Sequence, residues 1–175
     1  MQETAQQYIS RIRSYLGQSD PLSVLTSTPA ALRAKLHSIS DTDLRKRPAP
    51  EKWSILEQVV HLSDVEIAVG YRVRAILGAE DGIPIQGFDQ DKWQAAFNYK
   101  GRTLDSALNA YEAARKNNVE LYRSLSEAQW NKFGIHSERG KETVRDVVVL
   151  NAGHDVNHMR QIDQILSQET GAAAR

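Results

Sequence analysis

The chain has 175 residues, of which 41% are hydrophobic and 25% charged, and its 22 basic and 22 acidic residues give a formal net charge of zero. This composition excludes a disordered chain, and the length is typical of one domain, so we expect a single domain over residues 1–175. Neutral charge without a basic helix argues against a nucleic acid as the partner.

Cysteine does not occur, which excludes disulfides, thiolate metal sites, iron–sulfur clusters and a cysteine nucleophile. The first ten residues contain no basic segment followed by an apolar run, so we expect no secretory signal. No apolar stretch reaches the roughly 18 residues that a membrane-spanning helix needs. These features together predict a cytoplasmic protein with no membrane partner.

Capping residues mark the starts of the helices, because their side chains accept hydrogen bonds from the first free N–H groups. The candidate caps are Asp20, Thr28, Ser54, Thr103 and Thr143. The first two each precede a proline, which is favoured at the first helical position. We therefore predict a broken helical region over about 4–38 and long helices at about 54–78, 103–125 and 143–168.

Residues 79–102 form a long connection, which in a compact domain needs its own structure or a function. We expect a short helix from Asp91 to Phe97, held against the bundle by Trp93 and Phe97. No segment shows the alternation of a strand. Three long helices and a broken fourth predict an all-α fold, an antiparallel four-helix bundle with short extra helices in the connections.

Two core-facing stripes contain a charged residue where an apolar one is expected. Glu66 interrupts the stripe of the helix at 54–78, and Arg115 interrupts that of the helix at 103–125. Burying a lone charge is costly, so we hypothesise a direct Glu66–Arg115 ion pair. The alternative is that one stripe is rotated and its charge reaches solvent.

The inward face of the last helix carries four polar residues: Asn151, His154, Asp155 and His158. His154 and His158 lie one turn apart on the same side, and two imidazoles at this spacing can share a metal ion. A third ligand would then come from a facing helix, where His61 is the candidate. His37 and His136 lie near helix or loop ends, and we expect both to face solvent.

The residues around these histidines carry a family resemblance. Lys52-Trp53-Ser54 opens a helix, His61-Leu62 follows, and the last helix contains the run Gly153 to Ile162. Here the sequence resembles the DinB-like (YfiT-like) family of metal-dependent enzymes, over roughly residues 20–168. The resemblance implies a four-helix bundle, often a homodimer, with one divalent ion per chain, Zn or Ni, on three histidines that correspond to His61, His154 and His158.

Other polar residues are candidates for supporting roles. Asn151 and Gln161 each lie three residues from a histidine and could orient an imidazole or a bound water. Asp155 occupies the position of the glutamate in H-E-x-x-H, so it is the candidate catalytic base; the alternatives are an acceptor for a ligand histidine or an ion pair within the bundle. Arg115 could hold an anionic substrate instead of Glu66.

Three neutral imidazoles leave a coordination position open, and a divalent ion there lowers the pKa of a bound water or thiol. We therefore expect a metal-dependent enzyme with a small-molecule substrate, either a hydrolase or, as in some members of the resembling family, a low-molecular-weight-thiol S-transferase. One alternative is a non-catalytic, stress-related metal-binding protein. Another is a plain bundle whose histidines satisfy one another.

Overall fold

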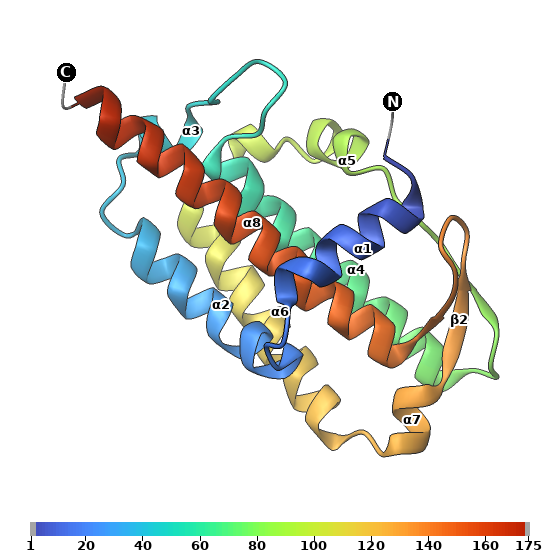
Figure 1. The fold of residues 1–175 in the computed structure, drawn as a ribbon. Coiled ribbons are helices and arrows are strands. Elements are labelled where there is room, and N and C mark those ends of the chain that lie inside the picture. The colour runs from blue at the N-terminus through green and yellow to red at the C-terminus, as the bar shows by residue number, and fades with distance from the viewer. Residues whose placement is uncertain (1–2, 174–175) are drawn as a thin grey trace.

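The computed structural model describes residues 3–173, with side chains to residue 168. Four helices pack around one core (Figure 1): α2 (Pro21–Leu36), α4 (Ile55–Gly78), α6 (Leu104–Ser124) and α8 (Val144–Ala173). The helix α1 (Ala5–Leu16) lies across the outside of α8. The predicted four-helix bundle is confirmed, and of the broken N-terminal helical region only α2 enters it.

The directions of the helices explain the long connection. α4 and α8 are antiparallel, but α4 and α6 run in the same direction, since Glu66 pairs with Arg115 and Arg74 bonds Asn117 further along both helices. α2 and α8 are likewise parallel. A 24-residue helix is about 36 Å long, so residues 79–102 must return the length of the bundle before α6 can begin.

This connection contains β1 (Ile83–Ile85), α5 (Gln90–Ala96) and the 3₁₀ turn η1 (Tyr99–Gly101). The short helix is confirmed, but the role expected for Phe97 is wrong, because Phe97 is 48% exposed. Trp93 stacks on Phe88 within the same connection. The connection is instead attached by Tyr99, which is fully buried, and by Gln94, whose amide donates to Glu57 at 2.8 Å.

A small sheet lies at one end of the bundle, contrary to the expectation of no strands. β1 pairs in parallel with β2 (Phe133–His136), which pairs antiparallel with β3 (Gly140–Thr143). Strands of three or four residues are too short to give a recognisable alternation. Gly134 is needed here, because a Cβ at this position would lie 2.6 Å from the Ile85 side chain.

Two short helices complete the fold, α3 (Asp41–Arg45) and α7 (Glu127–Asn131). Four of the five predicted caps accept the expected hydrogen bonds: Asp20, Ser54, Thr103 and Thr143. The helix start predicted at Thr28 is wrong, because α2 continues through Pro29. Proline donates no bond to the carbonyl four residues earlier, and Arg115 donates to that carbonyl, Leu25 O, at 2.9 Å.

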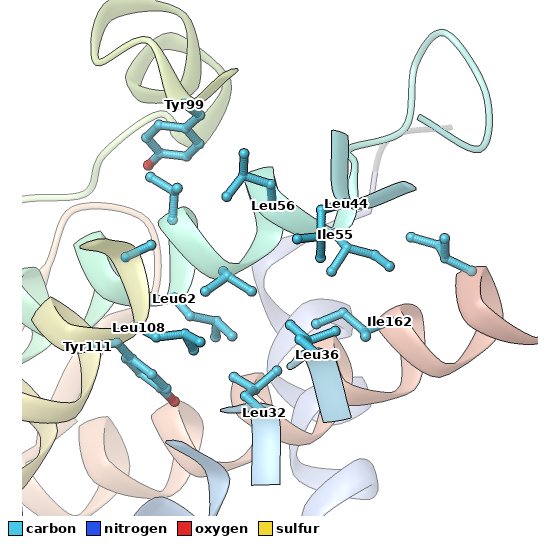
Figure 2. Packing of buried hydrophobic residues seen from close by; sticks show 14 residues of the cluster. Leu32, Leu36, Leu44, Ile55, Leu56, Leu62, Tyr99, Leu108, Tyr111 and Ile162 are labelled. Carbon is cyan, nitrogen blue, oxygen red and sulfur yellow. The ribbon is translucent and has the colours of Figure 1, made fainter. Parts of the chain in front are cut away.

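Two apolar clusters fill the two ends of the bundle. Figure 2 shows the first, where Leu36, Ile55 and Ile162 from three helices pack together. The second gathers Leu25, Val69 and Val148 at the end nearer the sheet. Buried polar side chains of α4, α6 and α8 lie between the two clusters. No helix among the described residues is both long and apolar enough to cross a bilayer.

Candidate metal centre

Three histidines converge from two helices in this polar layer. His61 lies on α4, and His154 and His158 lie one turn apart on α8. The Nε2 atom of His154 is 3.2 Å from that of His61 and 3.1 Å from that of His158. Nitrogens bound at about 2.0–2.1 Å to a tetrahedral zinc ion lie about 3.3–3.4 Å apart. These two distances are close to those between ligands of one ion, and all three ligand nitrogens lie within 4.8 Å of one another.

The hydrogen bonds of the rings also fit a cation. The Nδ1 atom of His158 donates to Gln58 Oε1 at 3.1 Å, so its Nε2 carries a lone pair. The Nδ1 atoms of His61 and His154 are buried and have no hydrogen-bond partner among the described residues. Since each neutral imidazole has only one N–H, three converging Nε2 atoms cannot all be satisfied by one another. A divalent cation would accept all three lone pairs.

The protonation states of the three rings also suit the binding of a divalent cation. Burial lowers the pKa of His61, His154 and His158 well below 6.5, and a neighbouring ring of the cluster lowers each further. All three rings are therefore neutral at pH 7, which is the form that binds metals. The donor set of imidazoles suits Zn, Ni, Co or Fe.

Two residues that sequence reasoning missed hold the rings in place. Trp53 packs edge-on against His61, with ring centroids 4.9 Å apart. Gln58 fixes the tautomer of His158, a role that metal sites give to a hydrogen-bonding neighbour. Gln58 lies three residues before His61, so the same spacing argument applied to the helix at 54–78 could have found it. Neither Asn151 nor Gln161, the expected partners, bonds a histidine among the described residues.

Next to the histidines lies a buried ion-pair network of Arg115, Glu66 and Asp155. Arg115 Nη2 lies 2.8 Å from Glu66 Oε2, which confirms the hypothesis of a direct ion pair. The second carboxylate is Asp155, whose Oδ2 accepts from Arg115 at 2.6 Å and from the Tyr111 hydroxyl at 2.9 Å. Asn118 and Asn151 donate to the two Glu66 oxygens.

This network bears on two expectations from the sequence. Both Nη atoms of Arg115 contact carboxylates or the Leu25 carbonyl, and the side chain is buried, which disfavours a role for Arg115 in holding a substrate anion. Both oxygens of Asp155 accept from Arg115, which favours the ion-pair role for Asp155 over that of catalytic base. Burial raises the pKa of Asp155 against the opposing effect of Arg115.

A cavity of about 530 Å³ opens beside the cluster and is lined by His61 and His154. The residues that would hold an ion, His61 and His154 among them, therefore lie at the wall of this cavity, where the ion would supply a Lewis acid to a ligand bound there. Part of its wall is formed by the N-terminal residues Glu3, Thr4, Ala5 and Tyr8 and by the connection residues 87–91. The N-terminal segment and the 79–102 connection therefore shape the pocket.

The remaining histidines differ from one another. His37 is exposed, as expected, and its ring contacts the Ala34 carbonyl. His136 is only 2% exposed, so the expectation that it faces solvent is wrong. The unpredicted strand β2 carries it inward, where it lines the same cavity as the metal-cluster histidines.

Comparison with known proteins gives consistent matches. Residues 25–162 match the DinB superfamily. A protein from Oceanobacillus iheyensis is 25% identical over 137 residues (78% of each chain), and one from Halalkalibacterium halodurans is 20% identical over 142 residues (81% of this chain, 82% of the other). Both bear the name "Putative metal-dependent hydrolase".

The same fold occurs in a solved structure. YfiT from Bacillus subtilis, described as "a probable metal-dependent hydrolase with an unusual four-helix bundle topology", superposes with a TM-score of 0.79 at 19% identity. The match covers 97% of this chain and 91% of that one. The mixed parallel and antiparallel bundle and the extent of the sequence match lead to one assignment: the chain belongs to the DinB superfamily.

Proposed function

We propose that this protein is a metal-dependent hydrolase that binds one divalent ion, Zn or Ni, through His61, His154 and His158. The observation that carries the proposal is the convergence of three Nε2 atoms beside a cavity, with that of His154 3.2 Å from that of His61 and 3.1 Å from that of His158. The names of two relatives, which describe metal-dependent hydrolases, support the same chemistry.

The chain's own residues prepare the site for this chemistry. Neutral imidazoles, kept so by burial, hold the ion, and Gln58 and Trp53 fix the orientation of two of the rings. When bound, the ion supplies a Lewis acid that activates water at neutral pH. Val65, Val69 and Leu150 contribute apolar side chains to the wall of the cavity beside the site.

The test is to load the protein with Zn or Ni and assay a panel of chromogenic esters, amides and phosphodiesters. We expect at least one class to be hydrolysed with the ion, and this activity to disappear with a chelator and in His154→Ala. His37→Ala, which changes an exposed histidine, is the matched control and should keep the activity. Hydrolysis that survives in His154→Ala would contradict the proposal.

Transfer of a low-molecular-weight thiol is the second candidate, because the same open ion binds a thiol as readily as water. The observation that favours it is Arg72 in the cavity wall, which has no carboxylate partner among the described residues and suits the acidic groups of small cellular thiols. Thiol consumption measured with an electrophile, in parallel with the hydrolysis panel, separates the two reactions.

The homodimer expected from the resemblance is also a proposal. Ile67, Tyr71 and Phe97 are 59%, 73% and 48% exposed and line one apolar groove, which suits a protein interface. Sedimentation of the wild type and of Tyr71→Asp tests it. A monomeric wild type at micromolar concentration would contradict it.

A further inference from the structure

The cavity beside the histidines is a channel between two antiparallel helices. On α4 its wall is formed by His61, Val65, Val69 and Arg72, at successive helical turns. α8 contributes Val147, Leu150, Asn151 and His154. The histidines thus lie at one end of the α4 stripe and Arg72 at the other, with apolar side chains between them. At 1.5 Å per residue, His61 and Arg72 are about 16 Å apart along the helix.

Arg72 is an unusual cation for such a position. Its side chain is half-buried, stacks over Phe88 with the guanidinium carbon 5.2 Å from the ring centroid, and donates one hydrogen bond to the Gln86 carbonyl. No carboxylate lies within 4.0 Å of it among the described residues. Burial lowers the pKa of Arg72, so the charge is held there at a cost that an anionic ligand would offset.

A second unused donor lies at the same end. His136 is 2% exposed, and its Nδ1 accepts a hydrogen bond from the Glu138 backbone N–H at 3.1 Å. The neutral ring therefore carries its proton on Nε2, which is buried and has no hydrogen-bond partner among the described residues. His136 and Arg72 line the same cavity.

The other charges around this end do not neutralise Arg72. The nearby Arg139 is paired with Glu142 through two hydrogen bonds of 2.6 and 2.9 Å. Glu138, Asp89 and Asp91 line the cavity too, but their side chains are exposed. Among the described residues, this end of the channel therefore presents a guanidinium without a carboxylate partner and an imidazole N–H without an acceptor.

From this arrangement, and resting on the proposed function, we propose that the substrate is an elongated molecule with a carboxylate at one end. The carboxylate binds Arg72 and the Nε2–H of His136, an apolar chain lies along Val65, Val69 and Leu150, and the reacting group reaches the three-histidine site. Arg72 and His136 are the residues that select this substrate class. A planar guanidinium is well suited to a carboxylate because it can donate two parallel hydrogen bonds.

The test uses ω-mercapto acids, from mercaptoacetate to mercaptoundecanoate, and the ω-mercapto alcohols of the same lengths. Each is titrated calorimetrically into the zinc-loaded protein, so that the thiol binds the ion and the other end probes the channel. We expect the longer acids to bind about tenfold or more tightly than the alcohols of equal length. This preference should be lost in Arg72→Gln and reduced in Arg72→Lys. Arg145→Gln, which removes an exposed arginine paired with Glu127 outside the cavity, should keep it.

The outcomes separate the two proposals. Equal affinity of acids and alcohols in the wild-type protein would overturn the substrate class while leaving the metal site intact. A preference that persists in Arg72→Gln would overturn the assignment to Arg72. Failure of the protein to bind either zinc or nickel would overturn the proposed function, and the elongated substrate with it. The comparison of acids with alcohols in the wild-type protein tests the substrate class even if Arg72→Gln does not fold.

Discussion

Two polar clusters interrupt the core of this bundle, and they differ in how fully their atoms are bonded. In the ion-pair cluster of Glu66, Arg115 and Asp155, all four carboxylate oxygens accept hydrogen bonds. In the three-histidine cluster, three Nε2 atoms face one another and two buried Nδ1 atoms have no partner among the described residues. Both clusters are largely buried, so the bonding of the groups that face one another separates them: every carboxylate oxygen of the first cluster has a protein donor, whereas the facing Nε2 lone pairs of the second have no such donor and fit a cation.

The largest expected effect is the loss of zinc affinity when one histidine ligand of the three-histidine cluster is removed. In His154→Ala the affinity for zinc should fall by more than about 100-fold, because loss of an outer partner of a metal ligand alone costs roughly 10–100-fold. Metal content after equilibration with zinc, measured by mass spectrometry, checks this against His37→Ala, which should keep one ion per chain. Retention of the ion by His154→Ala would place the metal elsewhere.

Breaking the ion-pair cluster should instead affect folding. Arg115→Met leaves Glu66 and Asp155 buried without their counter-ion, and we expect a loss of about 3–5 kcal/mol in the free energy of unfolding. Urea denaturation measures it. A loss of under about 1 kcal/mol would mean that the cluster is not the structural element described above.

In the metal-free protein, the pH dependence of the free energy of unfolding should reveal the histidine cluster. Burial lowers the pKa of its three rings in the folded state, so below pH 6.5 the unfolded chain binds protons that the folded chain does not. The contribution of the three rings to the free energy of unfolding is therefore complete above pH 6.5. It is lost as the pH decreases, so the free energy of unfolding should fall by up to about 4 kcal/mol between pH 7 and 5.5.

Urea denaturation across this pH range measures the slope of the free energy of unfolding against pH. The matched variant is His158→Gln, in which one of the three titrating rings is gone and the slope should decrease by about a third. A stability that stays constant from pH 7 to 5.5 would contradict the burial of three neutral rings.

The smallest effect should come from the residue that orients one ligand. Gln58→Ala removes the acceptor of His158 Nδ1, and we expect the zinc affinity to fall by roughly 10–100-fold while the ion still binds. Gln161→Ala is the control, because Gln161 bonds no histidine among the described residues. Equal affinities in the two variants would show that packing alone orients His158.

Helical periodicity and caps were sufficient to predict the bundle, because Ser54, Thr103 and Thr143 begin helices whose apolar stripes are buried. The Glu66–Arg115 pair could be predicted as well, since each charge interrupts such a stripe. The direction of α6 could not, because nothing local records that residues 79–102 return along the bundle. The burial of His136 also depends on a sheet whose three strands pair across some 50 residues of chain. Arg72, at the far end of the α4 stripe, becomes notable only once the cavity is known.

The most direct test of the metal centre is anomalous diffraction from crystals grown with zinc, measured on both sides of the zinc absorption edge. The account predicts one strong anomalous peak per chain, about 2.0–2.1 Å from the Nε2 atoms of His61, His154 and His158. A peak at other residues, or none between these three rings at saturating zinc, would contradict it.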